Sequence, residues 1–372
     1  MSLQVPQYIR DLVPYVPGKP IEETQREFQI KRVIKLASNE SPRGASPLAK
    51  KAIVAHLKQV HRYPDGSGFL MKKAISEHLG VSPQSLILGN GSNEIIDFLV
   101  RTFCLAGDMI AVPRASFIAY KICAQIHGVE TLETAVDKNF QVDIQDLVQQ
   151  VKKNERVRLV FLANPNNPTG TYLPEAQLKS LLQQIQAIRN GSVLVVLDYA
   201  YWEYVTASDL SEPLEIVRKF SNVMVLRTFS KIYGLAGIRA GYAVAPAEIV
   251  AHLEKVRQPF NLNSLALAGA TAALADVEFV RKSQKLNRRG MVLWEKALSE
   301  MGIPFWKSQG NFILVDVFRG LGMSGMDVYQ ACLRKGVIFR PLLNYGLPKV
   351  LRISLGTTEE NHFAIKVLGN LK

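Results

Sequence analysis

A lysine with two hydroxyl residues and an arginine close to it is the strongest chemical signal in this chain. Lys231 follows Thr228 and Ser230, and Arg239 comes eight residues later. A lysine amine can form a covalent bond with the carbonyl carbon of an aldehyde or ketone. The hydroxyls and the guanidinium could hold a phosphate group. A lone lysine would indicate only a solvated basic loop, so the prediction depends on the whole group.

A carboxylate ends one of the most apolar runs of the chain. Asp198 comes directly after Val193–Leu197, and Tyr201 follows three residues later. A buried carboxylate is costly unless it is paired, and the protonated nitrogen of a pyridine ring is a suitable partner. The alternative is that Asp198 caps a helix. Tyr201 could donate a hydrogen bond to an oxygen on the ring. Lysine, carboxylate and phosphate-holding groups together favour pyridoxal 5'-phosphate as cofactor.

Two polar segments follow other apolar runs. Ser92 and Asn93 stand after a Gly-Asn-Gly run, where we expect a helix to begin. The free N–H groups of a helix N-terminus bind phosphate. Glu94 occupies the position where a dinucleotide-binding fingerprint needs its third glycine, so that class of site is not indicated. Asn167 lies in the Asn- and Pro-rich turn Asn164–Gly170, which would hold its amide still.

Short apolar runs alternate with helical periods over residues 45–258. Four leucine and isoleucine residues, Leu178, Leu181, Leu182 and Ile185, recur on one helix face and predict a helix over 174–188. The expected strands are 86–88, 109–112, 159–162, 193–197, 223–227 and 241–244. Strands that alternate with helices indicate an α/β fold with a mostly parallel central sheet.

The carboxyl ends of strands in such a sheet are where ligands bind. Asn167, Asp198 and Lys231 all follow an expected strand, so we expect these side chains to meet. Phe117 follows the strand 109–112 and could stack on a flat ring. An isolated phenylalanine, however, more often belongs to a hydrophobic core.

The remaining residues predict a smaller α+β domain. A helical pattern runs from Asn263 to about residue 300. After it we expect strands over 312–315, 337–339 and 351–354, and helices over 326–334 and 359–368. The expected division is 1–44 as N-terminal arm and part of the small domain, 45–258 as the large cofactor-binding domain, and 259–372 as the small C-terminal domain.

Composition excludes several classes of protein. The 372 residues are 48% apolar and 21% charged, which is ordinary for a globular protein and not for a disordered one. Three scattered cysteines predict neither a disulfide framework nor a metal site. Without a signal peptide or a membrane span, we expect a cytoplasmic protein. The net charge of +13 favours anionic partners. The basic residues of the chain are scattered and form no dense run, so we expect no nucleic-acid partner and no membrane partner.

The order of the motifs resembles a known family. Asn-Pro-Asn-Asn-Pro-Thr-Gly at 164–170, Asp-x-Ala-Tyr at 198–201 and Ser-Lys with an arginine eight residues on are similar to the fold-type I pyridoxal-phosphate aminotransferases. Segments 35–40, 61–65, 336–341 and 351–357 resemble the histidinol-phosphate aminotransferases in particular. The match extends over nearly the whole chain.

The resemblance implies a role for each residue. Lys231 would carry the cofactor covalently and shuttle a proton, and Asp198 would pair with the pyridine nitrogen. The other implied cofactor contacts are Ser92, Asn93, Thr228, Ser230 and Arg239 to its phosphate, Asn167 and Tyr201 to the ring oxygen, and Phe117 to the ring face. Tyr63 would reach the cofactor of a second subunit in a homodimer. Arg340 and Arg352 would bind anionic groups of the substrate.

The implied reaction converts histidinol phosphate and 2-oxoglutarate to imidazole acetol phosphate and glutamate, a step of histidine biosynthesis. A broad aromatic amino-acid aminotransferase and a threonine-phosphate decarboxylase remain alternatives on the same scaffold, because no motif marks the side-chain pocket. Three residues depart from the family pattern, and one of them is Ser41, which replaces the asparagine of a usual Asn-Glu-Asn-Pro segment. Tyr199 replaces a usual glutamate, and Arg43 replaces an apolar residue near the expected substrate entrance.

Overall fold

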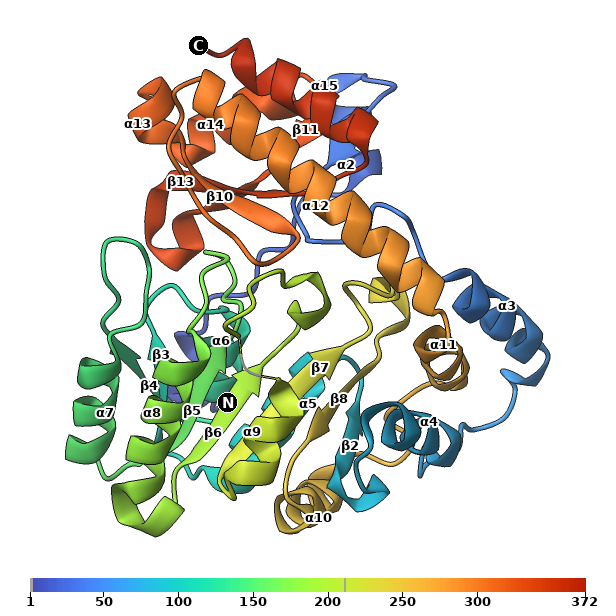
Figure 1. Ribbon diagram of the computed structural model, residues 1–372, viewed down its shortest axis with the longest axis vertical. Coiled ribbons are helices and arrows are strands. Elements are labelled where there is room, and N and C mark those ends of the chain that lie inside the picture. The colour runs from blue at the N-terminus through green and yellow to red at the C-terminus, as the bar shows by residue number, and fades with distance from the viewer. Residues whose placement is uncertain (1–2, 211) are drawn as a thin grey trace.

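The computed structural model describes residues 3–210 and 212–372. Its larger unit is built on a seven-stranded sheet in the order β2-β8-β7-β6-β5-β3-β4 (Figure 1). The strands are β2 (Leu86–Gly89), β3 (Met109–Pro113), β4 (Glu130–Thr134), β5 (Val157–Ala163), β6 (Leu194–Asp198), β7 (Val223–Thr228) and β8 (Gly241–Val244). Only β8 runs antiparallel to its neighbours, β2 and β7. The expected α/β fold with a mostly parallel sheet is confirmed.

Helices cover both faces of this sheet because the strand side chains alternate between them. Val196 packs with residues of α5 (Ser92–Phe103), α6 (Ala119–Ile126) and α10 (Ala247–Val256). Its neighbours Val195 and Leu197 pack with α7 (Ile144–Lys153), α8 (Glu175–Ala187) and α9 (Pro213–Lys219). With both faces buried, β6 consists entirely of buried residues, which explains why its sequence is a continuous apolar run.

The smaller unit contains a four-stranded antiparallel sheet in the order β12-β13-β10-β9. The strands are β9 (Phe305–Trp306), β10 (Phe312–Asp316), β12 (Arg340–Leu342) and β13 (Leu347–Ser354), and the helices are α13 (Val317–Leu321), α14 (Gly325–Leu333) and α15 (Thr358–Gly369). Near the N-terminus, α2 (Ile21–Phe28) precedes β1 (Ile34–Lys35), which pairs in parallel with β11 (Val337–Ile338). The strand expected at 337–339 is β11, and β12, which follows it and belongs to the other sheet, was not expected.

The helical stretch expected from Asn263 to residue 300 is two helices, α11 (Ser264–Leu274) and α12 (Val277–Glu300). Asp276 separates them and caps α12 by accepting a hydrogen bond from the N–H of Phe279. The α11 helix packs against α3 (Pro47–His56) and α4 (Phe69–Leu79), while α12 runs from there to the smaller unit (Figure 1). The division at residue 258 stays a prediction, and the packing of α11 favours a later boundary, near residue 276.

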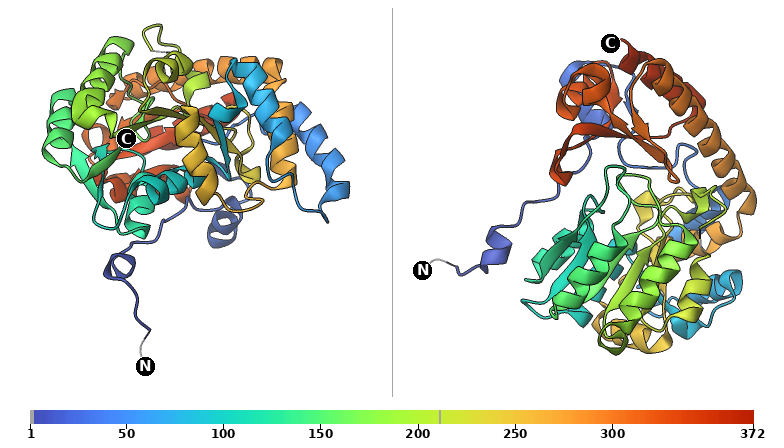
Figure 2. Two further views of the ribbon diagram at one scale, coloured as in Figure 1. Left: turned by 90° about the horizontal axis from the view of Figure 1, so that it is seen from below. Right: turned by 60° about the vertical axis from the view of Figure 1, so that its left-hand side comes forward.

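The start of the described chain forms an extended arm that leaves the body of the molecule (Figure 2). The arm carries one short helix, α1 (Gln7–Arg10), and its Tyr8 carbonyl accepts a hydrogen bond from Gln125 of α6. Within residues 3–210 and 212–372, no helix combines the length and the apolar composition that a bilayer crossing requires.

Candidate active site

A cavity of about 220 Å³ opens at the carboxyl ends of β5, β6 and β7. The fold gathers there ten of the residues that the sequence singles out: Ser92, Asn93, Phe117, Asn167, Asp198, Tyr201, Thr228, Ser230, Lys231 and Arg239. Ser38 and Glu40, which follow β1, complete one wall. Residues spread over more than 150 positions of sequence thus meet in one place, because parallel strands end at the same edge of the sheet.

Lys231 lies just after β7, and its Nζ donates a hydrogen bond to the Ser38 carbonyl at 3.2 Å. The same amine lies 5.7 Å from the centre of the Tyr201 ring. Burial, reinforced by the positive charge of Arg352, lowers the pKa of Lys231 to about 8. A lysine amine with this pKa is neutral in far more molecules near neutral pH than an ordinary lysine, so it can act as a nucleophile and as a base.

Asp198 ends β6 and is only 4% exposed. Its Oδ1 accepts the N–H of Ala200 at 3.0 Å, and its Oδ2 accepts the hydroxyl of Tyr120 at 2.8 Å. Burial raises the pKa of Asp198. It is not a helix cap, because the next helical turn, η4 (Trp202–Tyr204), begins after Tyr201. A carboxylate buried to this degree is stabilised by a positively charged partner, and the protonated nitrogen of a pyridine ring meets that need.

The start of α5 offers hydrogen-bond donors of the kind that bind an anion such as phosphate. Gly91 precedes the helix and no side chain caps its first N–H groups, which therefore remain available to an anion. A Cβ on Gly91 would lie 2.4 Å from a guanidinium nitrogen of Arg239, so only glycine lets the arginine come this close. Arg239 also donates to the Ser230 hydroxyl at 3.4 Å, and the Thr228 hydroxyl accepts the N–H of Ser230 at 3.1 Å.

Two polar side chains are held so that each can donate a hydrogen bond into the cavity. Asn39 donates to the Tyr201 hydroxyl at 2.9 Å, which leaves the Tyr201 proton to be donated elsewhere. Arg352 donates to Oδ1 of Asn167 at 2.6 Å, which leaves the Asn167 amide nitrogen as donor. Asn39 itself is fixed by Ser354 of β13, whose hydroxyl accepts its N–H at 2.8 Å. Such donors fit a ring oxygen, as the sequence predicts.

The two arginines that the resemblance predicts to bind substrate lie on adjacent strands of the smaller unit. Arg340 on β12 is the register partner of Arg352 on β13. Arg352 is buried and donates to the Ala37 carbonyl as well as to Asn167. Arg340 is partly exposed, donates to the Val16 carbonyl of the arm at 3.0 Å, and lies 5.7 Å from the Tyr15 ring centre. Arg352 contacts Asn167, which lines the cavity, and neither arginine lines the cavity itself.

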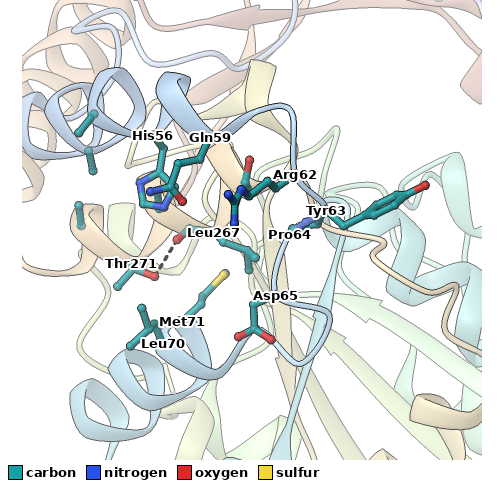
Figure 3. A pocket seen from close by; sticks show the side chains of 16 residues that line it. His56, Gln59, Arg62, Tyr63, Pro64, Asp65, Leu70, Met71, Leu267 and Thr271 are labelled. Atoms are coloured by element: carbon teal, nitrogen blue, oxygen red, sulfur yellow. Dashed lines mark hydrogen bonds between the residues drawn. The ribbon is translucent and has the colours of Figure 1, made fainter.

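Among the predicted cofactor contacts, Tyr63 lies away from the cavity. Its side chain is 84% exposed and stacks on Phe260 with ring centres 4.9 Å apart. It lines a separate groove, which α3, α4 and α11 border (Figure 3). Within one chain Tyr63 does not line the cavity that holds Lys231.

Sequence reasoning assigned no role to Ser38 and Glu40, which line the cavity, and it missed Tyr120 and Asn39, which contact residues that line it. Tyr120 follows Phe117 by one helical turn and contacts Asp198, but its spacing alone reads as a core position. Asn39 lies in segment 35–40, which resembles the histidinol-phosphate aminotransferases, but the resemblance implied no cofactor or substrate contact for it. The structure also shows where two residues that depart from the family pattern lie. Tyr199 is fully buried against Trp202, and Arg43 is exposed with its guanidinium 5.5 Å from the Phe279 ring centre.

Comparisons with known proteins agree with this geometry. Residues 31–368 match the family model of aminotransferase class I and II. The histidinol-phosphate aminotransferase of Anaeromyxobacter sp. is 46% identical over 99% of this chain and 98% of its own length, and histidinol-phosphate aminotransferase 2 of Pasteurella multocida is 43% identical over 95% and 94%.

A solved structure shares both the fold and part of the sequence. The histidinol-phosphate aminotransferase of Sinorhizobium meliloti, in complex with pyridoxal-5'-phosphate, superposes with a TM-score of 0.89 at 25% identity, covering 100% of this chain and 98% of that one. The aspartate aminotransferase of Thermus thermophilus shares the fold alone, with a TM-score of 0.86 at 18% identity and full coverage of both chains. The chain therefore belongs to the class I and II aminotransferases and, among them, to the histidinol-phosphate aminotransferase family.

Proposed function

We propose that this chain is a pyridoxal-phosphate-dependent aminotransferase that converts histidinol phosphate and 2-oxoglutarate to imidazole acetol phosphate and glutamate. The observation that carries the proposal is the arginine pair Arg340 and Arg352, held in register beside a cavity that contains Lys231 and Asp198. The family names of its relatives support the same substrate. The proposal includes a cytoplasmic location for the protein.

The residues of the cavity fit the cofactor. When bound, pyridoxal phosphate supplies an electron-withdrawing ring that stabilises negative charge at the α-carbon of the amine substrate. Asp198 would hold the ring nitrogen, and the start of α5 with Ser92, Asn93 and Arg239 would hold the phosphate. Thr228 and Ser230 supply hydroxyls to the same group, and Phe117 borders the cavity where the ring face would lie. Asn167 and Tyr201 would donate to the ring oxygen.

Lys231 would move the proton of the reaction. Its lowered pKa gives a neutral amine that can take a proton at Nζ and return it at a neighbouring carbon. Arg352 is already fixed by Asn167 and Ala37, so it would bind an anionic substrate group without reordering its own side chain. Arg340 adds a second planar fork suited to a phosphate.

The substrate assignment is tested by comparing amines under one set of conditions. We expect histidinol phosphate, with 2-oxoglutarate present, to give a higher kcat/KM than phenylalanine or threonine phosphate. Glutamate formation should accompany each turnover. A preference for phenylalanine would favour the broad aromatic aminotransferase. Release of carbon dioxide from threonine phosphate without glutamate would favour the decarboxylase.

The homodimer is a further part of the proposal, and an exposed apolar face supports it. The helices α3 and α4 and their connection expose large apolar side chains at Val54, Leu57, Val60, Phe69 and Leu70. The groove they border has a volume of about 530 Å³ (Figure 3). An apolar face of this kind is typical of a protein–protein interface. A second copy bound there by two-fold symmetry would bring its Tyr63 toward the first copy's cofactor.

Mixing two inactive variants tests whether the sites are shared. In a heterodimer of Tyr63→Phe and Lys231→Ala subunits, one site carries both lesions and the other carries none. We therefore expect activity above the sum of the two separate variants. Mixing Lys231→Ala with the double variant is the control, because no site then has a lysine and nothing should be regained. A monomeric and fully active protein in dilute solution would contradict the shared site.

A further inference from the structure

Tyr120 is a fully buried tyrosine whose hydroxyl donates a hydrogen bond to Oδ2 of Asp198 at 2.8 Å. It lies on α6, one helical turn after Phe117, and its N–H donates to the Phe117 carbonyl at 3.2 Å. None of the predicted cofactor contacts includes it, and it does not line the cavity.

Packing fixes the direction of this hydroxyl. The Tyr120 ring stacks on Phe161 of β5, with centres 4.8 Å apart and planes 14° apart. It meets the Phe117 ring edge-on, with centres 5.6 Å apart. A phenol held between two aromatic rings cannot turn its hydroxyl away without displacing them. The same residue therefore contacts both Asp198 and Phe117, the predicted partners of the ring nitrogen and the ring face.

Asp198 needs this donor because burial disfavours its charged form. The backbone N–H of Ala200 fixes one carboxylate oxygen, and the Tyr120 hydroxyl fixes the other. Hydrogen bonds to a charged acceptor are stronger than those between neutral groups, and their loss inside a protein leaves the charge poorly compensated.

We propose that Tyr120 is a positioning residue, which orients the Asp198 carboxylate and keeps it negatively charged so that it can pair with a protonated ring nitrogen. The proposal rests on the cofactor site proposed above. It assigns Tyr120 no contact with substrate or cofactor. Removing the Tyr120 hydroxyl should therefore weaken only ligands that have the ring nitrogen. A merely structural role of Tyr120 would affect ligands with and without this nitrogen alike.

Tyr199 provides a matched control within the same turn of chain. It is also fully buried and is adjacent to Asp198 in the sequence, but the Asp198 carboxylate accepts its hydrogen bonds from Ala200 and Tyr120 and not from Tyr199. Tyr199→Phe and Tyr120→Phe remove the same atom from the same type of residue. Only the second removes a hydrogen bond to the carboxylate.

The experiment measures the dissociation constants of two ligands for the cofactor-free protein. One is pyridoxal phosphate, and the other is its analogue with C–H in place of the ring nitrogen. We expect Tyr120→Phe to weaken pyridoxal phosphate roughly 10- to 100-fold, as expected for a lost hydrogen bond to a buried charge. Binding of the analogue should stay close to that of the unchanged protein, and Tyr199→Phe should change neither constant.

Each other outcome overturns the positioning role or the site itself. Equal weakening of both ligands by Tyr120→Phe would indicate a structural role, and thermal unfolding of the variant would show whether the fold had changed. Unaltered binding of both would mean that Asp198 does not depend on Tyr120. If the unchanged protein binds no pyridoxal phosphate, the proposed cofactor site itself is wrong. This result differs from a failure of the positioning role, because it is seen without any variant.

Discussion

Replacing Lys231 with alanine should reduce turnover by more than about 1000-fold, because one side chain supplies both the covalent attachment and the proton transfer. Lys231→Ala protein should also lose the visible absorption of covalently bound cofactor. Borohydride reduction of the unchanged protein with pyridoxal phosphate, followed by peptide mapping, should label Lys231. The rate at which the cofactor-free protein forms its covalent bond with added pyridoxal phosphate should rise as pH rises through about 8, because burial lowers the pKa of the amine to about 8 and only the neutral amine attacks the aldehyde.

Lys219→Ala is the control for this prediction. Lys219 is an exposed lysine at the end of α9, shortly before β7, and it lies outside the cavity. It should keep turnover and labelling unchanged. If another lysine carries the label and Lys231 does not, the assignment is wrong, whatever the activity of the alanine variant.

Removing the guanidinium of Arg340 should lower kcat/KM for histidinol phosphate far more than for phenylalanine. The anionic group of phenylalanine is a carboxylate, which Arg352 can bind alone. The phosphate of histidinol phosphate carries more charge and more acceptor oxygens, and it would use both arginines. A phosphate that loses a charged hydrogen-bond donor in an enclosed site loses roughly 2–4 kcal/mol, which corresponds to about 30- to 1000-fold in kcat/KM. Arg352→Leu should damage both substrates, because it also removes the partner of Asn167. Steady-state kinetics with both amines measure the difference.

Two further variants separate substrate binding from other effects of Arg340. Arg340 also donates to Val16 of the arm, so Arg340→Lys, which keeps the charge without the planar fork, should lie between the unchanged protein and Arg340→Leu. Arg334→Leu removes an exposed arginine at the end of α14 and should leave both substrates unaffected. If Arg340→Leu slows both amines equally, or neither, Arg340 does not read the phosphate and the broad aromatic aminotransferase becomes the better proposal.

The fold was predictable where a strand is apolar on both faces. The run before Asp198 and the run before Lys231 are buried strands, because each lies at the centre of a sheet covered by helices on both sides. The edge strand β4 was not predicted, since Glu130–Thr134 is largely polar and pairs only with β3. The break between α11 and α12 was also missed. Ala275 and Asp276 interrupt a helical pattern whose apolar residues continue on both sides.

The cavity residues were predictable because the chemistry follows the strands, which all end at one edge of the sheet. Residues that support them from behind were not. Tyr120 contacts Asp198 across a distance of 78 residues, and Asn39 contacts Tyr201 across 162 residues. Side-chain contacts of this kind are fixed by tertiary packing, and no local spacing reports them. The role of Tyr63 also stays a prediction, because within one chain its exposed side chain does not line the cavity and extends away from the other residues of the groove (Figure 3).

The arginine pair and the cofactor-holding residues stand on different sheets. Every predicted cofactor contact within the chain lies between Ser92 and Arg239, on the larger unit, whereas Arg340 and Arg352 belong to the hairpin formed by β12 and β13. Mutations at Arg340 can change which acid is bound without touching the predicted cofactor contacts, whereas mutations at Arg352 also remove the partner of Asn167. An ancestral gene with this layout could thus give rise to descendants with new substrates while inheriting an unchanged catalytic core, which is how one fold comes to serve many reactions.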